Sequence, residues 1–183
     1  MQIEGSDALD FNEAIEKGFE LFGKSDKFGF LIICGVNFGL RISDLLTITY
    51  GQLKLGEFVI NEKKRGKKRK IVVNSCVKKA LKVMEELDPV HYSLDESSPF
   101  RSQKGTVYSS QHVNRKLKKV FPSQKVKITS HSLRKGFGKQ LYEKTGHNIA
   151  LVQLALRHSS PEDTLRYIGV TQQEMDDCYN IIL

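Results

Sequence analysis

Ten residues, 61–70, constrain the fold more than any other segment, because seven of them are basic and one is acidic. They lie in and beside the turn between two β-like segments, 57–60 and 70–73, with Gly66 in the middle. A turn that carries so many cations is a poor element of a protein core. We therefore expect a small antiparallel hairpin whose turn projects into solvent.

A second basic segment, 111–130, holds six basic residues and no acid. Subtracting these two +6 segments from the net charge of +8 leaves −4 on the other 153 residues. Two basic patches on a mildly acidic body favour nucleic-acid binding, since each neutralised phosphate releases counterions. Two solvated basic faces are the alternative. The candidate DNA contacts are Lys63, Arg65, Lys67, Lys68, Arg69, Arg115, Lys116 and Lys119.

The composition is that of a globular protein, with 39% hydrophobic and 27% charged residues in a chain of 183. We expect one domain, 1–183, with a core at 11–170 and a tail at 171–183. No segment approaches the roughly 20 apolar residues that span a bilayer, so we expect no membrane partner. Three scattered cysteines without a CxxC pair indicate reduced thiols in a cytoplasmic protein.

The chain reads as mainly helical. Asp10 is a good N-cap for a first helix, 11–22, which Gly23 ends. Residues 89–108 read as a loop, and the segments 47–50, 57–60 and 70–73 read as short strands. The fold class is therefore mainly α with a small three-stranded antiparallel sheet. The further predicted helices are 26–38, 40–46, 75–87, 109–120, 132–145, 148–156, 161–168 and 171–181.

Three clusters combine phosphate-binding side chains with a specific local context. Arg41 starts a helical turn in Gly-Leu-Arg-x-x-Asp-Leu, where Asp44 can steer the neighbouring turn or brace the arginine. His131 and Arg134 are three residues apart on one helix face. His158 precedes Tyr167 by nine residues. Taken singly, each cluster has an ordinary structural explanation: a surface ion pair, a chance spacing and a core tyrosine.

A tyrosine hydroxyl is a poor nucleophile at neutral pH, since its ordinary pKa is about 10. Two arginines and two histidines around a phosphodiester would stabilise the extra charge of a pentacoordinate transition state. Such an arrangement would make a phosphodiester electrophilic enough for attack by a tyrosine.

The order of these motifs, with a lysine in a basic β-turn between the first two, resembles the tyrosine recombinase (phage integrase) family. The resemblance extends from about Phe11 to the end of the chain and is most specific from His131 to Ile168. It implies the catalytic-domain fold of the DNA breaking-rejoining enzymes. The activity implied is site-specific DNA recombination for a phage or mobile element, through a 3′-phosphotyrosyl intermediate like that of type IB topoisomerases.

The family's catalytic roles carry over residue by residue. Arg41 and Arg134 would hold the scissile phosphate, His131 and His158 would contact it, and Tyr167 would be the nucleophile. Asp44 matches a supporting acidic position. The mechanism requires no metal or nucleotide cofactor, because the phosphotyrosyl bond conserves the energy of the phosphodiester.

The family's β-turn lysine acts as general acid. Lys64 aligns best with it, two residues before the turn glycine, while Lys63 and Lys67 stay open because the basic run leaves the register uncertain. Arg157 departs from the pattern, since a glycine usually precedes the histidine at this point.

Full-length family members place a core-binding domain ahead of the catalytic one, and about ten residues precede the first helix here. We interpret the sequence as an excised catalytic fragment, with a minimal family member as the alternative. The expected partners are double-stranded DNA, further copies in a tetramer on paired sites, and accessory DNA-bending proteins. The tail 171–183 either docks on a neighbouring copy or covers its own domain.

Two other functions remain open. A non-catalytic DNA-binding module would use the two basic patches and carry an inert Tyr167. An RNA-binding accessory protein is less well supported, since aromatic stacking platforms are lacking.

Overall fold

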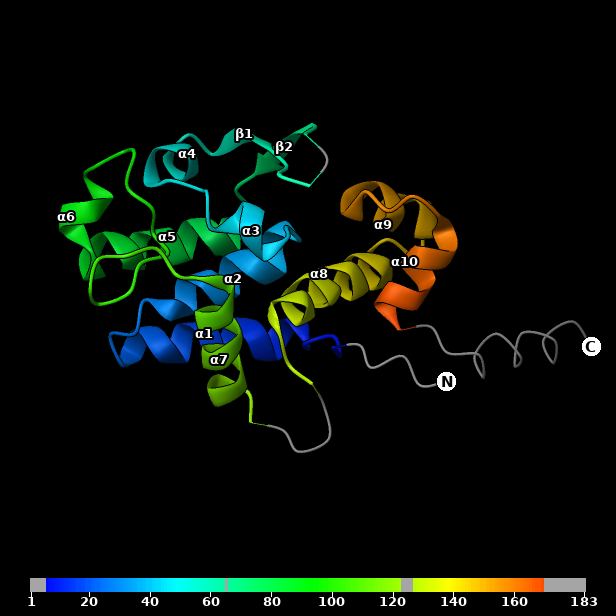
Figure 1. Ribbon diagram of the computed structural model, residues 1–183, viewed down its shortest axis with the longest axis horizontal. Coiled ribbons are helices and arrows are strands. Elements are labelled where there is room, and N and C mark those ends of the chain that lie inside the picture. The colour runs from blue at the N-terminus through cyan, green and yellow to red at the C-terminus, as the bar shows by residue number, and fades with distance from the viewer. Residues whose placement is uncertain (1–5, 65, 123–126, 170–183) are drawn as a thin grey trace, which may run out of the picture.

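The computed structural model describes residues 6–64, 66–122 and 127–169 (Figure 1). Every helix predicted within these ranges is confirmed to within two residues at each end, and the one predicted at 171–181 lies outside them. The elements are α1 (Phe11–Gly23), α2 (Phe28–Phe38), α3 (Ile42–Leu45), α4 (Tyr50–Lys54), β1 (Glu57–Asn61), β2 (Lys68–Val72), α5 (Ser75–Leu87), α6 (Pro89–Tyr92), α7 (Ser110–Val120), α8 (Ser130–Lys144), α9 (Ile149–Leu156) and α10 (Pro161–Ile168).

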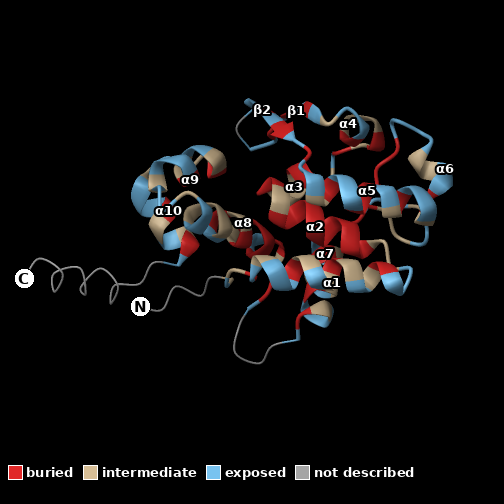
Figure 2. Cartoon of the chain, turned by 180° about the vertical axis from the view of Figure 1, so that it is seen from behind, coloured by how far each residue is buried: buried red, intermediate tan, exposed pale blue. Residues whose placement is uncertain are grey.

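Helix α2 forms the centre of the domain. It is apolar on nearly every side and buried along its length, and it packs against α1, α5 and α8 (Figure 2). Its contact with α1 is close because Gly18 and Gly29 face each other, and a Cβ on Gly29 would collide with the carbonyl oxygen of Gly18. The N-cap predicted for α1 is confirmed, since the amide of Glu13 donates to Asp10 Oδ1 at 2.8 Å.

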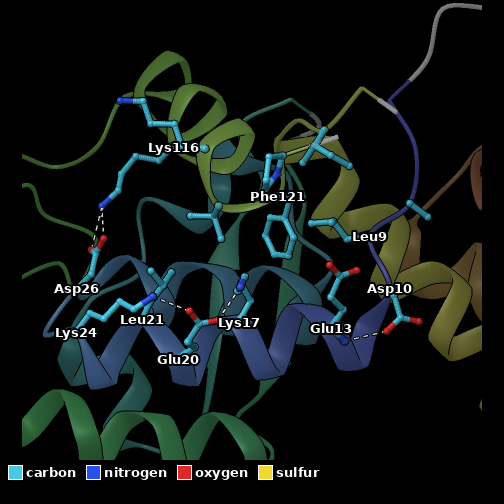
Figure 3. A pocket seen from close by; sticks show the side chains of 15 residues that line it. Leu9, Asp10, Glu13, Lys17, Glu20, Leu21, Lys24, Asp26, Lys116 and Phe121 are labelled. Atoms are coloured by element: carbon cyan, nitrogen blue, oxygen red, sulfur yellow. Dashed lines mark hydrogen bonds and ion pairs between the residues drawn. The ribbon is translucent and has the colours of Figure 1, made fainter. Parts of the chain in front are cut away.

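A hollow of about 720 Å³ opens between α1 and α7 (Figure 3). Leu9, Leu21 and Phe121 form its apolar part, and Lys116 crosses its edge to bind Asp26 at 2.8 Å. None of the six predicted catalytic residues lines this hollow. The functional site therefore has to be found elsewhere.

The prediction of a three-stranded sheet is wrong. Within the described residues the sheet has two strands, β1 and β2, which pair antiparallel from Glu57↔Val72 to Asn61↔Lys68. The segment 47–50, predicted as a strand, instead leads into α4. Thr49 and Gln52 form a capping box there, in which each side chain accepts from the other residue's amide. Local capping overrides the β propensity of this segment.

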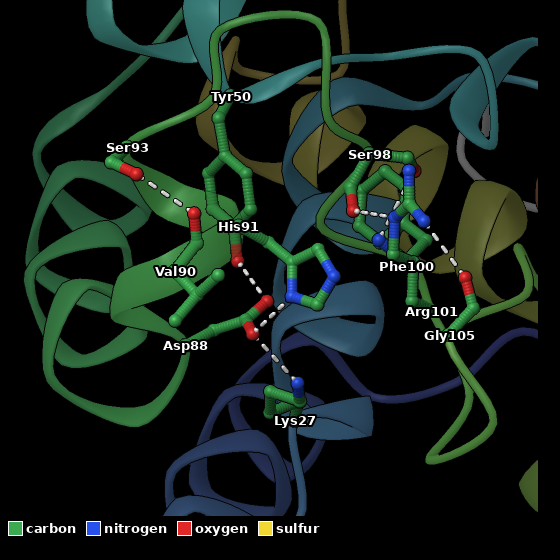
Figure 4. A network of polar contacts seen from close by, with 10 residues as sticks. All are labelled: Lys27, Tyr50, Asp88, Val90, His91, Ser93, Ser98, Phe100, Arg101 and Gly105. Atoms are coloured by element: carbon green, nitrogen blue, oxygen red, sulfur yellow. Dashed lines mark hydrogen bonds and ion pairs between the residues drawn. The ribbon is translucent and has the colours of Figure 1, made fainter.

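A buried carboxylate fixes α4 and α6 onto the helical core (Figure 4). Asp88 accepts hydrogen bonds at 2.9 Å from the hydroxyl of Tyr50 and from Lys27 Nζ, and lies 2.9 Å from His91 Nδ1. Burial alone would raise the pKa of Asp88, but the hydrogen bonds from Lys27, His91 and Tyr50 outweigh it and lower the pKa. The segment 89–108 is therefore more ordered than the predicted loop, since it contains α6 and a β-bridge between Arg101 and Val107.

The last three described helices form a smaller unit beside the core. Helices α9 and α10 pack on each other and on α8, at one end of the molecule (Figure 1). Val152, Leu156 and Ile168 are buried between them, and Tyr167 packs against this cluster. The unit sets the tyrosine at the junction between α8 and α10.

Candidate active site

The side chain of Arg134 connects the three segments that carry the predicted motifs. It is buried, with 2% of its surface exposed, although it is charged. Its Nη1 donates to the carbonyl of Gly39 at 2.6 Å, and its Nη2 donates to the carbonyl of Leu156 at 2.5 Å. Because these carbonyls lie just before Arg41 and His158, one side chain brings together three segments that are far apart in sequence. Two of the five guanidinium N–H groups are used in this way, and Arg134 also contacts the Tyr167 side chain, which leaves further donors for a ligand.

Arg41 enters the site from the turn between α2 and α3. Gly39 caps α2 with φ of 57°, and a Cβ there would collide with the ring of Phe137, so only glycine fits. Arg41 is the N-cap residue of α3, as predicted for the start of this helical turn. Its Nη1 is buried and has no hydrogen-bond partner among the described residues. A buried cationic donor without a partner is costly unless a ligand binds it.

Tyr167 lies on α10 and faces the two arginines. Its hydroxyl oxygen is buried and makes no well-formed hydrogen bond to any residue that the structure describes. The guanidinium carbon of Arg134 lies 6.0 Å from the ring centre, and Lys135 Nζ lies 5.4 Å from it. Burial raises the pKa of Tyr167, while the positive charge of Arg134, the hydrogen-bond contact with Arg134 and the positive charge of Arg41 act against that rise. The phenol is therefore protonated in the free protein.

The two predicted histidines also lie at this site. His158 contacts the Tyr167 ring edge to face, with 4.8 Å between ring centres, and its Nδ1 lies 3.1 Å from Thr164 Oγ1. His131 is in the first turn of α8. Burial and then the charges of Arg134, Arg41 and Lys135 lower its pKa. His131 is thus neutral at neutral pH and able to accept a proton.

Asp44 supports the hairpin turn. It is 1% exposed, and its Oδ1 accepts a hydrogen bond of 2.9 Å from the amide of Lys63. Of the two roles expected for this carboxylate, the contact agrees with steering the neighbouring turn. Asp44 Oδ2 is buried and has no hydrogen-bond partner within the described ranges.

The basic turn contains both exposed and buried cations. Lys63, Lys64, Lys67 and Lys68 are exposed, whereas Arg65 lies outside the described residues. Arg69 is buried, because alternate residues of β2 face inward, and its Nη2 donates to the carbonyl of Phe38 at 2.9 Å. Its guanidinium is thus part of the interior and is not available as a surface DNA contact.

The second basic patch lies on α7. Arg115 lies with its Nη2 at 3.2 Å from His112 Nδ1, and Lys116 is held in the ion pair with Asp26. Lys119 borders the hollow between α1 and α7. None of these three side chains contacts the Tyr167 cluster in a hydrogen bond or ion pair of the described residues.

Sequence reasoning missed one buried ionic contact. Glu62, the only acid in the basic run, is 1% exposed and lies 3.3 Å from Nη1 of Arg157 and 3.6 Å from Nη1 of Arg69. The one acid among seven bases is a sequence signal that could have drawn attention to Glu62, though not to its partner. Its partner Arg157 is 95 residues away, so spacing alone could not reveal the pair.

Metal-ligating side chains do not gather in the described part of the chain. No group of three or more His, Cys, Asp or Glu side chains there could hold a metal ion. No helix in the described ranges has the length and apolar character needed to cross a membrane.

The fold and the grouping of Arg41, His131, Arg134, His158 and Tyr167 define the class as a tyrosine recombinase catalytic domain. The structure is similar to that of XerA recombinase, with a TM-score of 0.70 and 21% identity, covering 98% of this chain and 65% of XerA. It is also similar to XerH bound to a palindromic difH substrate in a post-cleavage complex, with a TM-score of 0.63 and 25% identity, covering 96% of this chain and 53% of XerH.

The sequence comparisons agree. The model of the phage integrase family matches residues 7–174. The chain is 31% identical over 167 residues to the probable integrase/recombinase YoeC of Bacillus subtilis (strain 168), covering 88% of this chain and 87% of YoeC. It is 32% identical over 146 residues to the tyrosine recombinase XerC of Rickettsia prowazekii (strain Madrid E), covering 78% of this chain and 47% of XerC.

The chain belongs to the phage integrase family, a family of DNA strand-transferring enzymes. It spans most of the length of YoeC and about half the length of XerC.

Proposed function

We propose that this chain cleaves and rejoins double-stranded DNA in site-specific recombination, with Tyr167 as the nucleophile. One observation carries the proposal: the buried Nη1 of Arg41 lacks a hydrogen-bond partner among the described residues, and the buried hydroxyl of Tyr167 lies beside Arg134 without a well-formed hydrogen bond. A phosphodiester placed between them would supply an acceptor for the arginine and an electrophile for the phenol.

Arg41 and Arg134 hold the phosphate in this proposal. A guanidinium offers a planar fork of donors that matches two phosphate oxygens. Arg134 keeps free donors after binding the carbonyls of Gly39 and Leu156, and those two bonds fix its position before DNA arrives. Donors already in place cost little reorganisation when charge develops on the phosphorus oxygens.

The reaction is a transesterification. The Tyr167 oxygen forms a bond to phosphorus, the bond from phosphorus to the 5′ oxygen breaks, and the protein is left on the 3′ phosphate. The phenolic proton passes to neutral His131, and His158 binds a phosphate oxygen. The raised pKa of Tyr167 means that this proton has to leave as the attack proceeds.

Lys64 protonates the departing 5′ oxygen. It is exposed on the turn that Asp44 holds through the amide of Lys63, and Lys63 and Lys67 are the alternatives on the same turn. Attack by a 5′ hydroxyl of another strand reverses these steps and rejoins the DNA. The number of phosphodiester bonds is unchanged, as in type IB topoisomerases, so neither a nucleotide nor a metal is consumed.

Double-stranded DNA is the substrate. Among the structural relatives, XerH is bound to its difH substrate, and a lambda integrase dimer is bound to a COC′ core site. By analogy we assign the exposed lysines 63, 64, 67 and 68 and the α7 cations Arg115, Lys116 and Lys119 to the DNA backbone. We further propose synapsis as a tetramer, with DNA-bending accessory proteins, for a phage or mobile element on the bacterial nucleoid. We also propose that the chain forms one catalytic domain and that its tail, 171–183, docks on a neighbouring copy.

A covalent adduct assay tests this function. The chain and its Tyr167→Phe variant are incubated with supercoiled and nicked DNA, quenched in detergent and examined for DNA-linked protein. We expect an adduct with the unmodified chain and none with the variant. Tyr142→Phe is a matched control, since it removes a hydroxyl from the same cluster of helices. Stable DNA binding without any adduct would instead indicate a non-catalytic DNA-binding module.

A further inference from the structure

The turn that carries Lys64 is closed by Glu62. The amide of Glu62 donates to the carbonyl of Lys67 at 3.1 Å, and the amide of Gly66 donates to the carbonyl of Glu62 at 2.8 Å. Lys64 thus lies in a loop whose two ends meet at Glu62. The backbone of Glu62 therefore helps to fix the base of the loop that carries Lys64.

The side chain of Glu62 points away from solvent, into a cluster of arginines. Its carboxylate lies 3.3 Å from Arg157 Nη1 and 3.6 Å from Arg69 Nη1, and none of its side-chain surface is exposed. Its negative charge also acts on Arg134, where it favours the charged guanidinium. Burial lowers the pKa of Arg69 to about 10, with Arg134 and Arg157 adding to that effect and Glu62 opposing it. Glu62 is therefore the anion that offsets three neighbouring cations.

Arg157 connects the hairpin to the segment that holds His158. Its Nη2 donates to the carbonyl of Lys68 at 2.7 Å, next to its contact with Glu62. Both hydrogen bonds join the hairpin to the end of α9. Figure 1 shows the hairpin of β1 and β2 on the side of the core that faces α9.

The backbone of Arg157 supports a specific role for its side chain. Arg157 caps α9 in the left-handed region, with φ of 52° and ψ of 48°. A side chain there is strained, and glycine is the usual residue. The strain persists because the guanidinium is bound at both Glu62 and Lys68.

From these contacts we propose that Glu62 and Arg157 are positioning residues for strand cleavage. Together they hold the turn of Lys64 at a fixed place relative to His158 and Tyr167. The inference rests on the proposed function, because it assigns a purpose to the position of the general acid. It also explains why a buried acid occurs inside a run of cations in which Lys63, Lys64, Lys67 and Lys68 are exposed.

The test uses a chemical rescue. The cleavage sequence is first mapped from the DNA attached in the covalent adduct. Two duplexes of that sequence are then compared, one with the natural 5′ oxygen at the cleaved bond and one with a 5′-bridging sulfur. The sulfur leaves as a thiolate and therefore needs no general acid. The variants are Glu62→Gln and Arg157→Gly, and the second also relieves the backbone strain. Glu57→Gln is the matched control, because Glu57 is an exposed acid of the same hairpin, paired with Lys70.

We expect Glu62→Gln and Arg157→Gly to cleave the oxygen duplex about 10- to 100-fold more slowly, since a displaced general acid loses much of its effect. On the sulfur duplex both variants should come within about twofold of the unmodified chain, as expected when only the acid is misplaced. Glu57→Gln should cleave both duplexes normally. An equal loss on both duplexes, or no loss on either, would overturn the inference.

Hydrogen exchange in the free protein provides a second measurement that needs no DNA. The peptide 57–72 should exchange faster in Glu62→Gln and Arg157→Gly than in Glu57→Gln, with α2 unchanged. Unchanged exchange of this peptide would also overturn the inference. If the unmodified chain cleaved neither duplex, the proposed function itself would be contradicted. This result differs from failure of the inference, because it does not depend on a variant.

Discussion

Replacing Arg134 with lysine should separate the structural and the catalytic contribution of one side chain. The guanidinium donates to two main-chain carbonyls from a position that is 2% exposed. A lysine ammonium has one nitrogen and cannot reach both carbonyls, so one buried carbonyl loses a charged donor. Such a loss costs about 2 kcal/mol of unfolding free energy. For a chain of this size, that lowers the melting temperature by about 4–8 °C.

Arg41→Lys is the matched comparison. Arg41 makes no side-chain hydrogen bond to another described residue, and its Nη1 is unpartnered. Its replacement should change the unfolding free energy by no more than about 0.5 kcal/mol. Both variants should lose about 10²- to 10³-fold in the rate of adduct formation, since each removes a fork of donors from the phosphate.

Thermal unfolding followed by circular dichroism measures the melting temperature and the unfolding free energy. Quenched adduct formation on one DNA substrate measures the rate of cleavage. An Arg134→Lys protein that melts with the unmodified chain would refute the bridging role of Arg134. Equal destabilisation by Arg41→Lys would refute the assignment of its free donors to a ligand. Normal cleavage by either variant would remove that arginine from the catalytic site.

Three further predictions concern the turn, the histidine and the supporting acid. Lys64→Ala should lose cleavage of the oxygen duplex and recover on the 5′-bridging sulfur duplex, and rescue of Lys63→Ala or Lys67→Ala instead would move the general acid. Because the folded pKa of His131 lies below its ordinary value of 6.5, the unfolded chain binds more protons as pH falls through about 6.5. The free energy of unfolding should therefore decrease as the pH decreases through that range. His131→Gln should reduce the slope of the unfolding free energy against pH, and an unchanged slope would count against the lowered pKa of His131. Asp44→Asn should speed amide exchange at Lys63, measured by NMR, and unchanged exchange would show that Asp44 does not hold the turn.

Much of the fold could be predicted because its determinants are local. Asp10 caps α1 through the amide of Glu13, and the apolar run of α2 is buried as its sequence implies. The strand predicted at 47–50 failed because Thr49 and Gln52 cap a helix, and because Tyr50 reaches a carboxylate 38 residues away. A β-rich tetrapeptide contains no information about that distant partner.

In the site, too, local sequence features could be predicted and contacts between distant segments could not. Motif order was enough to predict Arg41, His131, Arg134, His158 and Tyr167, and the structure brings these side chains to one place. Charge counting treated the basic run as uniform, yet the two-residue period of β2 turns Arg69 inward together with Ile71.

The ionic bridge between Glu62 and Arg157 could not be predicted at all. It depends on how the hairpin and the end of α9 lie in space. Neither local propensity nor motif spacing describes that arrangement.

The most direct test of the central claim identifies the residue that becomes linked to DNA. The covalent adduct is digested with nuclease and protease, and the nucleotide-bearing peptide is sequenced by mass spectrometry. The account predicts a nucleotide attached through its 3′ phosphate to Tyr167. Attachment to another residue, or a 5′ linkage, would contradict it.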